Sequence, residues 1–168
     1  MKLAATRTWR DERGSVLLEA AIVLPVLFAL IFGVLEFSYF FYQQHLMSTG
    51  VRDAARYLAR VVDPTSAAAQ AAAQNLAASG TIATVSTRRV KGFDPGEVAV
   101  SFRFVDNSIG GDGNRPYRLG PEAGLPNSLR IVRVTGSFTW APVGFWSYFG
   151  FGTKTVTVTH EQRFIGAS

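Results

Sequence analysis

The fold of this chain is decided by residues 16–42, VLLEAAIVLPVLFALIFGVLEFSYFFY. Glu19 and Glu36 are the two charged residues of this stretch, and residues 20–35 carry no charge. A helix over the stretch would be about 40 Å long at ~1.5 Å per residue, whereas the hydrocarbon core of a bilayer is ~30 Å thick. The stretch therefore predicts one membrane-spanning helix.

A cleavable secretory signal peptide does not fit this pattern. Such a peptide has an apolar region of about 7–15 residues that ends in a small-residue cleavage site. Here the uncharged run is followed by aromatic residues, namely Phe37, Tyr39, Phe40, Phe41 and Tyr42. Aromatic side chains are enriched at membrane–water interfaces, so we interpret this cluster as an interfacial belt and the helix as a retained one.

The basic residues around the helix indicate its orientation. Arg10 and Arg13 lie directly before the apolar run, and the first basic residue after it is Arg52. Lysine and arginine are enriched on the cytoplasmic side of membrane helices. We therefore expect a single-pass protein with a cytoplasmic N-terminus and an exported C-terminal body, although Arg56 and Arg60 reduce the contrast.

Composition excludes several classes of function. Of the 168 residues 48% are apolar, 17% are charged and none is cysteine, which excludes disulfide scaffolds, thiolate zinc sites and cysteine nucleophiles. The net charge of +5 is not gathered into a Lys/Arg cluster, so we expect no nucleic-acid partner. His45 and His160 belong to no metal or hydrolase motif. We predict no enzymatic activity, no metal, no cofactor and no small-molecule substrate.

Two residues inside the apolar run have both a functional and an ordinary interpretation. Glu19 places a carboxylate in or near the hydrocarbon region, and an acid inside a membrane is a candidate for a functional residue. In the ordinary interpretation, the Glu19 side chain reaches the lipid headgroups. Pro25 removes one backbone hydrogen bond and predicts a kink, although proline is also tolerated in membrane helices without further consequence.

Beyond the membrane the helical pattern continues to Val62, where Asp63-Pro64 breaks it. Thr65 or Ser66 can cap a second, alanine-rich helix over residues 67–79, closed by Gly80. Three arginines recur at four-residue spacing on the first helix: Arg52, Arg56 and Arg60. They form one ridge, either a contact for lipid phosphates or an acidic partner, or a solvated face with Asp53 near Arg56.

From Thr81 onward the apolar period changes to two. Alternating residues predict strands near 98–105, 132–140 and 154–160, with a weaker strand around 81–90. Because no long helices connect them, an antiparallel sheet is favoured over a parallel one. We predict an α+β fold: a long N-terminal transmembrane helix, a second short helix, and a small antiparallel sheet.

Two loops are distinctive. Residues 106–126 contain D-N-S-I-G-G-D-G-N; we favour a structural loop over a calcium site, because the EF-hand spacing and its terminal glutamate are missing. Residues 142–152, PVGFWSYFGFG, carry Phe145 and Trp146 among other aromatics. They form either a hairpin folded on the core or an exposed apolar patch that contacts the membrane or another subunit.

A family resemblance rests on the start of the helix. Gly14 precedes S-V-L-L and then Glu19, in the sequence R-G-S-V-L-L-E-A-A-I-V-L-P; Gly33, Glu36 and A-A-R at residues 54–56 follow. This arrangement resembles the TadE-like family, the minor pilins or pseudopilins of the tight-adherence (Flp) pilus, a type IV pilus system. Major pilins of that system have a tyrosine after the glutamate, where this chain has Ala20.

The resemblance implies a pilin-like fold and a sequence of events. A prepilin peptidase would cut between Gly14 and Ser15, separating a basic cytoplasmic leader (1–14) from the helix (15–62), the short helix (63–80) and a periplasmic β-rich region (81–168). Glu19 would then pair with the new amine of an adjacent subunit during assembly. The implied partners are other pilin or pseudopilin subunits and the assembly platform, at the inner membrane or within the pilus.

An alternative function remains open. The chain could be an uncleaved, membrane-anchored periplasmic scaffold or binding module that never enters a fibre. An attached leader in the mature protein would favour this second interpretation.

Overall fold

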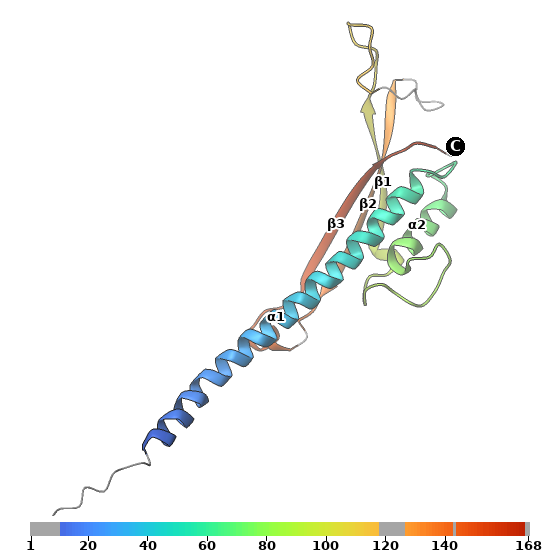
Figure 1. Ribbon diagram of the computed structural model, residues 1–168. Helices are drawn as coiled ribbons and strands as arrows, with labels where there is room; N and C mark the ends of the chain where they lie inside the picture. The colour runs from blue at the N-terminus through green and yellow to red at the C-terminus, as the bar shows by residue number, and fades with distance from the viewer. Residues whose placement is uncertain (1–10, 118–126, 143, 167–168) are drawn as a thin grey trace, which may run out of the picture. The chain divides into compact units, whose positions relative to one another are not determined.

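The structure, a computed structural model, describes residues 11–117, 127–142 and 144–166, with the backbone alone for residues 11–13 and Phe145. In chain order, the described elements are α1 (Asp11–Leu58), α2 (Ala67–Ser79), the 3₁₀ turn η1 (Pro95–Glu97), β1 (Val98–Asp106), β2 (Ser128–Trp140), α3 (Phe145–Tyr148) and β3 (Lys154–Arg163). The predicted α+β fold is confirmed (Figure 1). The chain divides into two compact units, one with residues 1–39 and 142–152, the other with residues 40–141 and 153–168.

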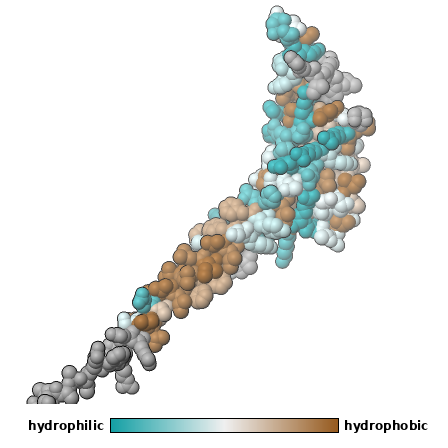
Figure 2. All heavy atoms as spheres, in the orientation of Figure 1, coloured by the Kyte–Doolittle hydropathy of each residue, from teal (hydrophilic) through white to brown (hydrophobic). Residues whose placement is uncertain are grey.

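The first unit contains the N-terminal part of α1, whose apolar side chains face outward. From Val16 to Leu35 the large apolar residues are exposed, and Figure 2 shows them as a continuous brown surface. Within the described residues this is one helix long and apolar enough to cross a membrane. Such a surface is costly in water and stable in lipid, so the helix fits a single-pass membrane protein.

The C-terminal end of α1 lies in the second unit and comes four residues earlier than expected. The helix ends at Leu58 and not at Val62. The carbonyl of Ala59 accepts hydrogen bonds from the amides of Ile165 and Gly166, at 2.9 and 3.2 Å. Since this carbonyl is bonded to the C-terminal segment, the next residues turn away from the helix.

The second helix has the predicted bounds and caps. The Ser66 hydroxyl accepts a hydrogen bond from the amide of Ala69 at 3.3 Å, and Gly80 has a φ of 85° and closes the helix by donating to Leu76. α2 packs closely on α1 because both present small residues to each other. A Cβ at Gly50 of α1 would collide with the carbonyl oxygen of Ala77 on α2.

The described strands form one antiparallel sheet in the order β1-β2-β3. β2 lies in the centre, with Val134 opposite Val100 on one side and His160 on the other. One face of the sheet covers the C-terminal part of α1 and α2, and the core between them contains Met47, Val51, Leu58, Val132 and Phe138. Close approach is required here too, because a Cβ at Gly136 would lie 2.9 Å from both Phe93 and Val51.

The prediction of a weaker strand around residues 81–90 is wrong, because this segment contains no strand. Its backbone is bonded to α2: the amide of Arg89 donates to the carbonyl of Ala78 at 2.8 Å. Side chains hold it as well, because Asn75 donates to Ile82 and Thr84, each at 3.3 Å. With its polar groups bonded to a helix, the segment does not extend the sheet.

The opposite face of the sheet is polar. Glu161 of β3 lies between Arg133, at 2.5 Å, and Arg103, at 3.5 Å. The hydrogen bond from Arg133 is the main reason why the pKa of Glu161 lies below its ordinary value. On the same face the hydroxyls of Thr135 and Thr159 are 3.0 Å apart.

Candidate functional site

The predicted processing and assembly residues lie together at the start of α1. Gly14 and Ser15 are the fourth and fifth residues of the helix, which begins at Asp11, and both are exposed. A Cβ placed on Gly14 would meet no atom within 4 Å among the described residues. Glu19 lies four residues after Ser15, so the two share one helical face. Both Ser15 and Glu19 are exposed on this face.

The Glu19 carboxylate is exposed, and no ion pair or hydrogen bond links it to another described residue. It is surrounded along the helix by exposed apolar residues such as Leu18 and Ile22. A charged carboxylate in lipid or in a packed apolar assembly requires a positive partner. The described residues supply no such partner to Glu19.

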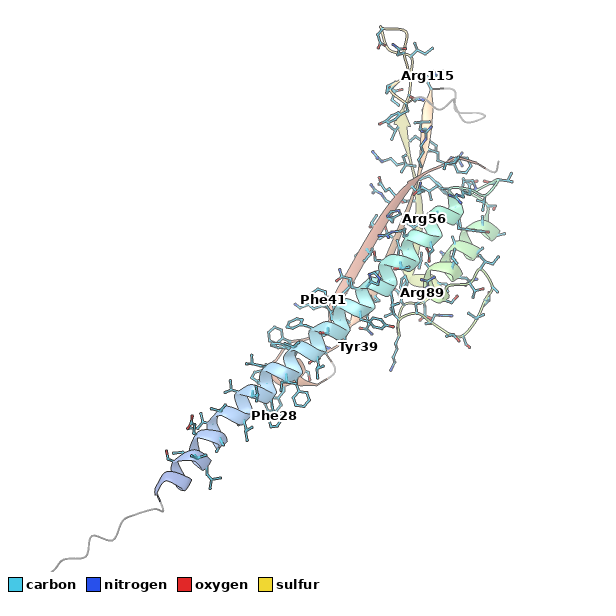
Figure 3. All side chains as sticks on the ribbon, viewed as in Figure 1. Phe28, Tyr39, Phe41, Arg56, Arg89 and Arg115 are labelled. Carbon is cyan, nitrogen blue, oxygen red and sulfur yellow. The ribbon has the colours of Figure 1, made fainter. Side chains whose placement is uncertain are left out.

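Pro25 lies within α1 and leaves it a continuous helix from Asp11 to Leu58. Proline lacks an amide hydrogen, so the carbonyl one turn earlier has no intrahelical partner. The predicted kink stays a prediction. Phe28 projects outward from the helix one turn later (Figure 3).

The second feature of the first unit is the aromatic loop, residues 142–152, which packs on α1. The backbone amide of Trp146 donates a hydrogen bond to Glu36 Oε2 at 3.1 Å. The Trp146 ring lies 5.0 Å from the ring of Phe37 and 5.0 Å from that of Phe151. The loop closes on itself, because the amide of Phe151 donates to the Trp146 carbonyl at 3.0 Å.

This contact buries a carboxylate beside the apolar run. Glu36 is only 8% exposed, and Gly33, one turn earlier on the same helical face, is also buried. The loop supplies the donor that a buried acid needs. The choice between a hairpin folded on the core and an exposed apolar patch stays a prediction. Trp146 packs on α1, and the Phe145 side chain lies outside the described residues.

Sequence reasoning missed the role of Glu36. It placed this residue near the aromatic belt and gave it no partner, because the loop that contacts it follows more than a hundred residues later. Two unusual sequence features could have indicated this contact: a second acid at the end of an uncharged run, and an aromatic loop without charge between two strands. Neither feature by itself says that the two segments meet.

The arginine ridge lies in the second unit. Arg52, Arg56 and Arg60 are exposed, and no ion pair links them to other described residues. Asp53, expected near Arg56 in the solvated-face interpretation, pairs with Arg89 at 3.0 Å. The ridge therefore keeps its positive charge uncompensated within the described part of the chain.

The loop after β1 has local hydrogen bonds of its own where it is described. The Asn107 side chain accepts from the amide of Tyr117 at 2.9 Å, and Asp112 accepts from the amide of Asn114 at 3.1 Å. Residues 118–126 of this loop lie outside the described residues. Among the described residues no group of three or more acidic or histidine side chains could hold a metal ion.

A comparison with protein families finds a match for a segment of α1. Residues 14–56 match the family described as TadE-like protein, which confirms the resemblance. The matched segment contains Gly14, Glu19, Gly33 and Glu36, and thus both the predicted processing and assembly residues and the residue that binds the aromatic loop. The family is associated with the Tad pilus and is not a family of enzymes. No curated protein and no solved structure matches this chain.

Proposed function

We propose that the protein is a minor pilin or pseudopilin of the tight-adherence pilus and that it acts through the N-terminal part of α1. The observation that carries this proposal is Glu19: an exposed carboxylate without a partner among the described residues, one turn from Ser15, on a helix that matches the TadE-like family. Its role is assembly with other pilin-like subunits and not catalysis.

The chemistry of processing supports this role. Cleavage after Gly14 removes the basic leader and creates an α-amine on Ser15. This amine is about 6 Å along the helix axis from Glu19, at ~1.5 Å per residue. In a bundle of such helices, the amine of one subunit can pair with Glu19 of its neighbour. The pair offsets the cost of burying either charge and fixes the axial register of the two helices.

The orientation follows from the same segment. Arg10 and Arg13 precede the apolar run, which supports a cytoplasmic leader on which a prepilin peptidase can act. The sheet unit then lies on the periplasmic or extracellular side. In this proposal the protein is a single-pass inner-membrane protein before assembly, and its partners are the peptidase, pilin-like subunits and the assembly platform.

One observation favours the second candidate function, an uncleaved membrane-anchored scaffold. α1 begins at Asp11, so Gly14 and Ser15 lie within a helical turn and not in an extended segment. A peptidase has to unwind this first turn to reach the peptide bond. A chain that retains its leader would stay in the membrane with Glu19 near the headgroups.

N-terminal sequencing decides between the two functions. The chain should be isolated from membranes of cells that contain the prepilin peptidase, and its mature form should begin at Ser15. Gly14→Leu should leave the longer precursor, because in this proposal the peptidase cuts after the glycine at this position. The matched control is Gly96→Leu. Gly96 lies in η1, outside α1, and a Cβ there would meet no atom within 4 Å, so this variant should be processed normally. Wild-type protein that begins at Met1 in these cells would contradict the pilin proposal.

A further inference from the structure

The aromatic loop presents a second apolar surface beside α1. Trp146 is turned toward the helix, whereas Tyr148, Phe149 and Phe151 are 89%, 58% and 50% exposed. Residues 142–152 contain no charged side chain. Exposed aromatic residues in an uncharged loop are unfavourable in water, so this surface calls for an apolar or interfacial environment.

The hydrogen bond between Trp146 and Glu36 fixes the position of the loop along the axis of α1. The uncharged run covers residues 20–35, and its midpoint lies between Leu27 and Phe28. Glu36, which accepts the hydrogen bond from Trp146, is therefore about 13 Å from the midpoint along the axis, at ~1.5 Å per residue. Half the hydrocarbon thickness is ~15 Å. The loop is thus attached at the level where hydrocarbon meets the headgroups.

We propose that the aromatic loop is a second membrane-binding element, which inserts Tyr148, Phe149 and Phe151 into the interfacial region of the leaflet through which α1 leaves the bilayer. The inference rests on the proposed membrane span of α1. Lipid is the occupant that fits, because the loop contacts α1 at Phe37, which belongs to the exposed apolar surface of the helix, and offers no charge for a polar partner. Tyrosine and tryptophan favour this region of a bilayer.

The insertion also accounts for the buried Glu36. A carboxylate at the edge of the hydrocarbon is costly unless it is bonded, and the Trp146 amide provides a bond that water cannot reliably provide there. The loop lies between β2 and β3, so its insertion gives the chain a second, non-covalent point of attachment to the membrane besides α1.

The depth of a single spin label tests the inference. The chain has no cysteine, so Tyr148→Cys gives a unique labelling site on the full-length protein. The labelled protein is reconstituted at low density in vesicles of phosphatidylethanolamine and phosphatidylglycerol, and the nitroxide is exposed to oxygen or to a water-soluble nickel chelate. Two reference sites bracket the result: Leu30→Cys in the apolar run and Thr157→Cys on the exposed face of β3.

We expect the Tyr148→Cys label to be several-fold less accessible to nickel than the Thr157→Cys label, and shallower than the Leu30→Cys label. Equal nickel accessibility at 148 and 157 with a protected Leu30 label would overturn the inference and leave the membrane span intact. An accessible Leu30 label would overturn the span, and the inference with it. A label at 148 that is shielded from both reagents would indicate a protein contact and also overturn the inference.

A second pair of variants tests whether docking on α1 sets the depth. Trp146→Ala removes the ring contacts with Phe37 and Phe151, and should raise the nickel accessibility of the Tyr148→Cys label toward that of Thr157→Cys. Phe28→Ala is the matched control: its ring contacts Phe32 on the same helix, away from the loop, and the label should keep its depth. An unchanged depth in Trp146→Ala would contradict docking as the cause.

Discussion

Substitution of Glu19 by glutamine tests the proposed assembly mechanism most directly. The change keeps the size and helix propensity of the side chain and removes its charge. Glu19 is exposed on α1 and unpaired among the described residues, so the isolated chain loses no contact. Membrane insertion should become easier, since a neutral side chain enters the bilayer at lower cost. Any defect therefore has to arise from contact with another molecule.

The expected size of that defect follows from the proposed pair. Breaking a buried pair by removing one partner costs about 3–5 kcal/mol, because the other charge stays buried and unpaired. Every ~1.4 kcal/mol corresponds to a factor of ten in an association constant. Glu19→Gln should therefore weaken the contact between adjacent helices by a factor of hundreds to thousands. Glu19→Asp keeps the charge on a shorter side chain and should retain part of the affinity.

Crosslinking between subunits and pilus counts by electron microscopy measure this loss. The variant should reach the membrane at the wild-type level, fail to crosslink and yield few or no pili. Glu97→Gln is the matched control, because Glu97 is an exposed carboxylate of the second unit whose side chain accepts a hydrogen bond from Ser137 at 3.3 Å. Glu36→Gln is unsuitable as a neutral control, since Glu36 binds the aromatic loop. Normal piliation with Glu19→Gln would refute the pairing mechanism.

Two further predictions concern the second unit of the full-length chain in detergent micelles. Gly50→Val should lower the free energy of unfolding by about 1–3 kcal/mol, because a Cβ there collides with the Ala77 backbone and α1 and α2 must separate. Thermal unfolding followed by circular dichroism measures this loss. The control Ala71→Val, on the exposed face of α2, should change the stability far less. The pKa of Glu161 lies below its ordinary value in the folded protein, so its contribution to stability is present above the ordinary pKa and is lost as the pH falls through the lower, folded value. Unfolding midpoints measured from pH 6 down to about pH 3 should fall less steeply for Arg133→Gln than for the wild type, and equal slopes would contradict the assignment.

Local patterns in the sequence were sufficient for the elements that depend on neighbouring residues. The uncharged run after Glu19 predicts α1, and Ser66 with Gly80 predicts both ends of α2, since capping bonds join residues three or four positions apart. Alternating apolar residues predict the three strands for the same reason, because each strand exposes one side chain in two to the core. The family segment at residues 14–56 is likewise contained in one continuous helix.

Contacts between distant segments were decided by the tertiary structure alone. The polar segment 81–90 reads as a weak strand, but the Ala78 carbonyl and the Asn75 side chain bind its backbone, a choice that depends on where α2 ends in space. Asp53 could pair with Arg56 on its own helix, yet it pairs with Arg89. Glu36 meets Trp146 across 110 positions of the chain. Such pairings depend on which distant segments pack together within each unit, and a local sequence pattern contains no information about this packing.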